Sequence, residues 1–325
     1  MKLNRLTILL ILALAACGSQ VTPENVIPPE EVLQRATRAV QKLDSAQYVA
    51  QSDFDINSDK FSAVGTARID GMLQDAGEQL RFQLDLTADI RGIEGPSSVA
   101  GTLEVVVITE DEVYMNIHSL TSQPNSAIFR PEIIGMLSGK WWQLSEGDTL
   151  PVAEKITPDP RLLQAQAQVV SVTRDRGITT INGRDAHHYD TTLDKEKLVS
   201  YLAAIAKEQF QEFDAAETQA AIEDIKASGQ LWIDAETYFV QKIAWVVQSI
   251  PLEGDGIASV SFTITFRNHN DAPAIIPPQN AKVFSPAVFF TLPTEALFQE
   301  ELEYQQDTQF DEDTILDIMQ NMNTY

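Results

Sequence analysis

Long segments in which apolar and polar residues alternate are the feature that most restricts how this chain can fold. Alternate positions between residues 80 and 90 are apolar, namely Leu80, Phe82, Leu84, Leu86, Ala88 and Ile90. Residues 258–266 repeat the pattern with Ala258, Val260, Phe262, Ile264 and Phe266. A period of two predicts antiparallel strands with one apolar and one polar face. Because these strands are long, their apolar side must curl around a filling, either the protein's own helices or a ligand.

The rest of the chain adds further strands and a few helices. Alternating segments bounded by turn-forming residues predict strands at residues 48–56, 61–69, 98–109, 113–118, 140–144, 170–174, 178–181, 184–192, 230–234 and 238–249. Helical spacing of apolar residues predicts helices at 30–44, 131–137, 161–169 and in a long stretch that opens at Asp194 and ends at Gly229. No strand–helix–strand unit repeats, so the predicted class is α+β, mainly antiparallel β, with about ten strands.

The N-terminal segment predicts export and lipidation. Residues 1–5 carry two basic side chains, residues 6–14 are apolar, and Ala15 and Ala16 precede Cys17, the only cysteine. A basic start, a short apolar run and a small-residue cleavage site are typical of a secretory signal peptide, and the run is too short to span a membrane. The segment that ends at Cys17 resembles the lipobox of bacterial lipoproteins, in which the cysteine sulfur receives a diacylglycerol and becomes the first residue.

We therefore expect a signal peptide at residues 1–16, a lipidated Cys17 and an extended tether at residues 17–29. The acyl chains would anchor the protein on the extracytoplasmic side of a bacterial cell envelope. Gly18 is not the aspartate that favours inner-membrane retention, which indicates the outer membrane if the host is diderm; a monoderm host stays open. The alternative is an ordinary exported protein whose Cys17 lies near the cut by chance.

The charge of the chain excludes one class of partner. Removal of residues 1–16 would take away two of the 23 basic residues and leave 21 against 47 acidic ones, a net charge of −26. Such a surface repels phosphate backbones, so nucleic acid is not expected as a partner. It also repels anionic headgroups, so a lipid anchor, and not surface charge, must hold the protein at a membrane.

Several short phrases resemble the LppX/LprG-type lipoproteins. They are residues 139–144 (GKWWQL), 181–189 (INGRDAHHY), 193–198 (LDKEKL), 229–238 (GQLWIDAETY) and 266–270 (FRNHN), followed by Pro277 and Pro278. That family shares the fold of the lipoprotein carriers LolA and LolB. The resemblance implies a strongly bent, unclosed half-barrel over residues 30–280, with helices packed in its concave face and an apolar cavity inside. Residues 281–325 would be an acidic C-terminal extension outside the family pattern.

The apolar faces of the strands are the candidate ligand site. The residues expected to line the cavity are Phe82, Leu84, Leu86, Ile243, Trp245, Phe262, Ile264 and Phe266. The expected partner is a lipid or another hydrophobic ligand, which wide apolar walls with few polar groups would bind. Two alternatives stay open: these residues simply pack on the long helix, or the fold is a protein-interaction or envelope-sensing module whose acidic extension contacts an envelope protein.

Motifs for enzymatic or metal chemistry are incomplete. The spacing of Asp53, Asp55, Asn57 and Asp59 matches the opening of a calcium loop, but Ser58 and Val64 replace the required glycine and glutamate. His187 and His188 are adjacent in an expected strand, so they should point to opposite faces and not share one ion. No Gly-x-Ser-x-Gly motif occurs. We expect no enzyme, no metal and no cofactor.

Overall fold

The fold is described by a computed structural model that places residues 27–92, 95–109, 111–124, 131–144, 169–208, 213–252 and 256–284. The predicted signal peptide, Cys17 and the helix expected at residues 161–169 lie outside these ranges, apart from Val169. The described residues fall into two compact units, unit 1 within the bounds Met1–Leu43 and Asp159–Ile250, and unit 2 within the bounds Asp44–Pro158 and Pro251–Tyr325.

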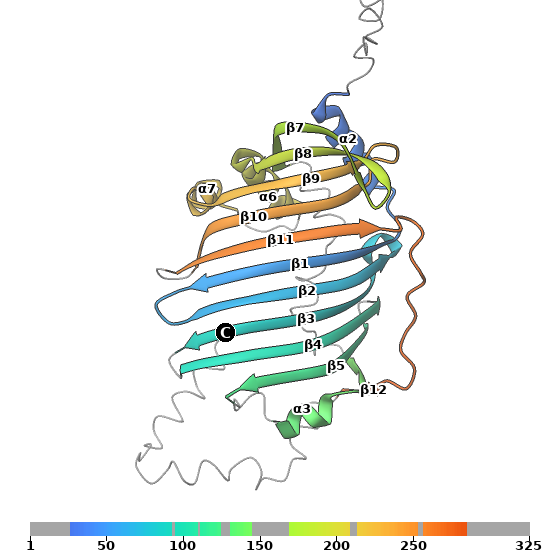
Figure 1. Ribbon diagram of the computed structural model, residues 1–325, viewed down its shortest axis with the longest axis vertical. Helices are drawn as coiled ribbons and strands as arrows, with labels where there is room; N and C mark the ends of the chain where they lie inside the picture. Colours follow the sequence, from blue (N-terminus) through green and yellow to red (C-terminus); the bar gives the residue numbers. More distant parts are fainter. Residues whose placement is uncertain are drawn as a thin grey trace, which may run out of the picture. The chain divides into compact units, whose positions relative to one another are not determined.

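Unit 2 is built around one sheet. Its strands are β1 (Ala46–Asn57), β2 (Ser62–Gln74), β3 (Gln79–Gly92), β4 (Gly95–Thr109), β5 (Glu112–Gln123), β6 (Trp141–Leu144), β11 (Ile257–Arg267) and β12 (Lys282–Val283). They lie in the order β12-β6-β5-β4-β3-β2-β1-β11, and all neighbours are antiparallel except β12 and β6 (Figure 1). The 3₁₀ turn η1 (Asp75–Gly77) joins β2 to β3, and the helix α3 (Pro131–Leu137) precedes β6.

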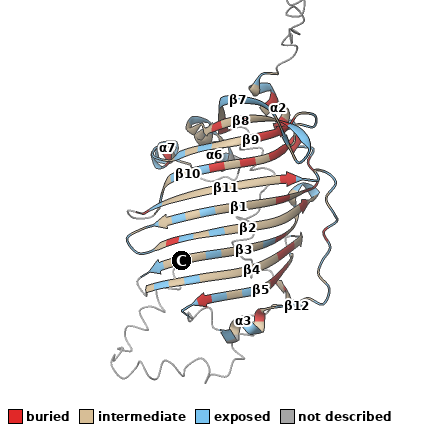
Figure 2. Ribbon diagram, viewed as in Figure 1, coloured by how far each residue is buried: buried red, intermediate tan, exposed pale blue. Residues whose placement is uncertain are grey.

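The alternation predicted for the long strands is confirmed. Leu86 pairs with Ala67 on β2 and with Gly101 on β4, while its neighbour Asp85 pairs with Arg68 and Thr102. Because paired residues share a face, the sheet has one apolar and one polar side. Much of β1 to β4 is half-buried (Figure 2), so neither face is fully covered along these strands.

Unit 1 contributes four antiparallel strands and, in its described residues, three helices. Its strands β7 (Val170–Ile181), β8 (Arg184–Leu193), β9 (Lys226–Asp234) and β10 (Val240–Pro251) follow one another in this order. The helices are α2 (Pro29–Val40), α6 (Lys195–Glu208) and α7 (Ala215–Ile222). As predicted, α2 begins with a proline and acidic residues in its first turn. Its Arg35 donates a hydrogen bond of 2.6 Å to the hydroxyl of Tyr238.

Two of the phrases that resemble lipoproteins meet in unit 1. The Arg184 guanidinium, in the phrase at residues 181–189, donates hydrogen bonds of 2.5 and 3.0 Å to the carboxylate of Asp234, in the phrase at residues 229–238. Asp234 ends β9 and is almost fully buried. These residues therefore hold the β8 and β9 ends together, which is a structural role.

The sequence prediction of one long helical stretch from Asp194 to Gly229 is wrong. The described residues form two separate helices, α6 and α7, and Asp214 caps the second by accepting hydrogen bonds from its first backbone amides. Gly229 lies inside strand β9. A Cβ atom there would be only 2.6 Å from the Trp245 ring on β10, so the glycine makes room for the aromatic ring across the strand pair. The sequence alone does not distinguish a glycine that ends a helix from one that leaves space for a side chain on a neighbouring strand.

The strand count and the end of the sheet also differ from the prediction. The described residues form twelve strands, not about ten, and the class is mostly antiparallel with few helices, as predicted. The last strand, β12, lies at the start of the segment expected to be a separate extension, and Lys282 pairs with Trp142 on β6. The segment between β11 and β12 packs Ile275 against Val106 and Tyr114, which ties it to the polar face of unit 2.

Candidate ligand-binding site

Strand register in unit 2 brings six of the eight predicted site residues onto one face. The first row across the strands comprises Phe266, Tyr48, Gly71, Phe82, Val105 and Met115, in this order. The second row comprises Ile264, Ala50, Ile69, Leu84, Leu103 and Ile117. The third comprises Phe262, Ser52, Ala67, Leu86, Gly101 and Leu120. We refer to these three rows as the apolar face.

Burial changes along the apolar face. In the first row Tyr48, Phe82 and Phe266 are each at least 98% buried. In the second and third rows the predicted residues Leu84, Leu86, Phe262 and Ile264 are only half-buried. The face therefore has one closed end and an open part lined by large apolar side chains and free of charged residues, which is the arrangement that an acyl chain needs.

The remaining two predicted residues belong to unit 1. Ile243 and Trp245 lie on β10, where they pair with Leu231 and Gly229, and both are buried. Their assignment to the same cavity as the unit 2 residues stays a prediction.

Sequence reasoning missed Tyr48. It lies in the first row on β1, and its ring covers Gly71 so closely that a Cβ atom there would be 2.4 Å from the Tyr48 Cζ. The hydroxyl has no hydrogen-bond partner among the described residues, although Tyr48 is 1% exposed. Burial raises the pKa of Tyr48 above its ordinary value, so the hydroxyl stays protonated at neutral pH. The only signal in the sequence is a tyrosine at an apolar position of a strand.

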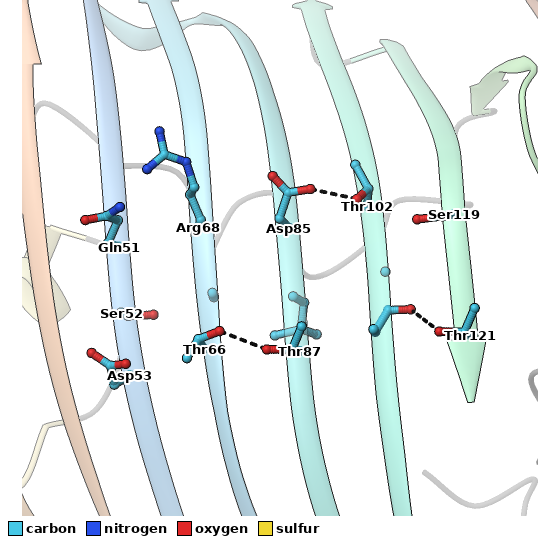
Figure 3. Close-up of a pocket in the computed structure, with 14 residues that line it drawn as sticks. Gln51, Ser52, Asp53, Thr66, Arg68, Asp85, Thr87, Thr102, Ser119 and Thr121 are labelled. Carbon is cyan, nitrogen blue, oxygen red and sulfur yellow. Dashed lines mark hydrogen bonds between the residues drawn. The ribbon is translucent and has the colours of Figure 1, made fainter. Parts of the chain in front are cut away.

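The polar face of unit 2 carries a shallow hollow of about 540 Å³. The side chains on this face that line it and are labelled in Figure 3 are those of Gln51, Asp53, Thr66, Arg68, Asp85, Thr87, Thr102, Ser119 and Thr121. The lining also includes Ser52, Ala67, Leu86 and Gly101, which alternate with these residues along the strands and belong to the third row of the apolar face. Thr102 donates a hydrogen bond of 2.6 Å to Asp85, and the Thr66 and Thr87 hydroxyls are 2.8 Å apart (Figure 3). Hydroxyl and charged groups of this kind favour water over an acyl chain, so the side chains on this face do not form a hydrophobic site.

The candidate metal motifs form no metal site in the described structure. Asp53 and Asp55 are residues of strand β1, in agreement with the strand predicted at residues 48–56, and not of a loop. His187 stacks on Tyr189 at a centroid distance of 6.2 Å, whereas His188 stacks on Trp232 at 4.4 Å, so the two rings have different neighbours. Burial lowers the pKa of both histidines. Within the described ranges no three histidine, cysteine, aspartate or glutamate side chains converge as metal ligands.

Comparisons with known proteins give similarities to solved structures only. No family model and no curated protein matches the chain. The crystal structure of LprF from Mycobacterium bovis shares 17% identity with it over 78% of this chain and 97% of that one, with a TM-score of 0.36. The lipoprotein LppX from Mycobacterium tuberculosis shares 9% identity with it over 76% of this chain and 97% of that one, with a TM-score of 0.32. A DUF1329 family protein from Desulfovibrio piger shares 11% identity with it over 74% of this chain and 92% of that one, with a TM-score of 0.22.

LppX, whose family the sequence phrases resemble, is thus among the solved structures to which this chain is similar. Among the helices that the structure describes, none is long and apolar enough to cross a membrane.

Proposed function

We propose that this protein is a membrane-anchored, extracytoplasmic lipoprotein that binds or carries a hydrophobic ligand, a lipid, on the apolar face of unit 2. The observation that carries the proposal is the half-buried second and third rows, in which Leu84, Leu86 and Ile264 leave apolar surface uncovered. Large uncovered apolar surfaces are unusual in soluble domains unless they bind something.

Binding would be driven by burial of apolar surface. Each Å² of apolar surface removed from water contributes about 25 cal/mol, so an acyl chain laid over several residues can be held without any charged contact. The two rows supply aliphatic and aromatic side chains from six neighbouring strands, which offers a continuous contact surface instead of isolated patches.

Anchoring would come from the N-terminus. Diacylglycerol on Cys17 would attach the chain to the membrane, and the tether at residues 17–29 would place the folded units above it. The high negative charge of the chain gives no electrostatic attraction to anionic headgroups, so the acyl chains would supply the membrane affinity.

The variant Leu84→Glu is expected to abolish lipid binding without unfolding the protein. A carboxylate at position 84, in the half-buried second row, would have to lose its hydration beneath an acyl chain, which is unfavourable. The mature chain with Cys17→Ser, purified in soluble form, would be examined by native mass spectrometry and organic extraction for a co-purifying lipid, and by titration with a fluorescent fatty acid.

The matched control is Gln83→Glu, which puts the same charge on the adjacent, exposed residue of β3. It faces the other side of the sheet and should leave lipid binding unchanged. If the Cys17→Ser protein carries no lipid and ignores fluorescent fatty acids, the proposal is wrong and the protein-interaction alternative stands. Equal loss of binding in both variants would also contradict the assignment to this face.

A further inference from the structure

The apolar face contains one buried polar atom that the fold does not use. Tyr48 is 1% exposed, and its hydroxyl finds no hydrogen-bond partner in the part of the chain that the structure describes. Buried hydroxyls in folded proteins are nearly always hydrogen-bonded, so an unpaired one calls for a partner that is absent from the protein itself.

The position of this hydroxyl relates it to the proposed ligand site. Tyr48 pairs with Gly71 on β2, and its ring lies over this glycine, where a Cβ atom would be 2.4 Å from the Tyr48 Cζ and 2.5 Å from the hydroxyl oxygen. The half-buried second row begins two residues farther along each strand, a distance of about 7 Å. The hydroxyl therefore lies over Gly71 at the closed end of the apolar face, one row away from the half-buried second row.

The surroundings select the kind of atom that could accept this hydrogen bond. The Tyr48 hydroxyl is protonated at neutral pH and can donate. Its neighbours in the first row, Phe266, Gly71 and Phe82, are apolar and carry no cation. A buried carboxylate would be left without a counter-charge there, whereas an uncharged carbonyl oxygen needs one donor only.

We propose that the Tyr48 hydroxyl donates a hydrogen bond to the carbonyl oxygen of an uncharged acyl ester bound on the apolar face. This inference rests on the proposed function, since it assigns the polar contact of the same ligand site. Apolar area would supply the affinity, and Tyr48 would distinguish an ester from a hydrocarbon of similar size and fix its position along the strands.

The test is the variant Tyr48→Phe, which removes only the unpaired oxygen. The matched control is Tyr189→Phe in unit 1, because the Tyr189 hydroxyl is also fully buried and unpaired among the described residues. Two probes would be titrated against the full mature chain with Cys17→Ser: N-phenyl-1-naphthylamine, which has no carbonyl group and fluoresces in apolar surroundings, and methyl decanoate, which displaces it.

The expected result is a loss of about three- to tenfold in affinity for methyl decanoate in Tyr48→Phe, with naphthylamine binding unchanged. The Tyr189→Phe control should bind both probes as the parent does. Infrared spectra of ¹³C-carbonyl methyl decanoate should show the bound carbonyl band at lower wavenumber in the parent than in Tyr48→Phe. The urea unfolding midpoint of Tyr48→Phe without ligand should be equal to or higher than that of the parent, because no internal hydrogen bond is lost.

Other outcomes separate the two proposals. Unchanged ester affinity in Tyr48→Phe, or an equal loss for both probes, would overturn the role of Tyr48 and leave the proposed function intact. A lowered unfolding midpoint in Tyr48→Phe would also overturn it, because the hydroxyl would then have an internal partner. A parent protein that binds neither probe would refute the proposed function itself.

Discussion

The variant Asp234→Ala is expected to lower the free energy of unfolding of unit 1 by about 2–4 kcal/mol. The Asp234 carboxylate is 1% exposed and accepts hydrogen bonds from Arg184, from the Thr237 backbone amide at 2.7 Å and from the Gln241 amide at 2.7 Å. Alanine would leave these donors unpaired, and Gln241 is itself buried. Urea denaturation would measure the loss, and hydrogen exchange would locate it in β8 to β10.

The matched control for this prediction is Asp185→Ala. Asp185 lies on β8 next to Arg184, but it is exposed, and its side chain accepts a hydrogen bond of 3.2 Å from Thr180. Surface hydrogen bonds of this kind contribute little, so the control should change the stability by less than about 0.5 kcal/mol. Similar losses in the two variants would show that the buried network does not hold unit 1 together.

The same network predicts how stability depends on pH. Burial acts to raise the pKa of Asp234, but the hydrogen bonds from Arg184 and Thr237 outweigh it and hold this pKa well below its usual range. In the unfolded chain an aspartate titrates near pH 3.9, so the stabilisation is complete above about pH 5 and is lost as the pH falls. The stability difference between the parent and Asp234→Ala should therefore shrink below about pH 4, and a constant difference down to pH 2 would contradict this.

The variant Gly71→Val should destabilise unit 2 by about 3 kcal/mol. A Cβ atom at position 71 would lie 2.4 Å from the Tyr48 ring, and the ring is held at the closed end of the apolar face beside Phe266, with ring centroids 6.3 Å apart. Overpacking in a buried site forces side chains away from their preferred rotamers and shifts the backbone. Thermal or urea unfolding of the full chain would show the loss.

Two further variants make this prediction specific. A Cβ atom at Gly92, at the end of β3, would meet nothing within 4 Å, so Gly92→Val should be nearly neutral. In the double variant Tyr48→Ala with Gly71→Val, the clash is removed, so the two effects should couple favourably by about 0.5–3 kcal/mol. Additive effects would mean that Tyr48 and Gly71 are not in contact.

Local patterns were sufficient to predict much of the fold. The alternation at residues 80–90 places Leu84 and Leu86 on one face of β3, and the same holds for Phe262 and Ile264 on β11. A period of two is a property of single strands, so it can be read without knowing their neighbours. The same reasoning failed at Gly229, whose role depends on the Trp245 ring on another strand.

In the candidate site, too, some features could be predicted from the sequence and others depend on the tertiary structure. The sequence identified apolar residues that could contact a ligand, but it did not single out Tyr48, because a tyrosine is ordinary in a strand. What distinguishes Tyr48 is that its hydroxyl is unpaired, and that depends on every group packed around it. Likewise, the motif that suggested calcium could be judged from its own missing ligands, whereas the Asp234 network was invisible before β8 and β9 were paired.

By itself, the sequence determined the antiparallel class, the apolar and polar sides of the long strands, the negative charge and the N-terminal pattern that predicts lipidation. These follow from residue types and their spacing, which act over a few neighbouring positions. Only the tertiary structure decided which strands adjoin, that the apolar face is closed at Tyr48 and open at Leu84, and that Arg184 meets Asp234. Those features depend on register between segments far apart in the chain, and register is set by packing across the whole sheet.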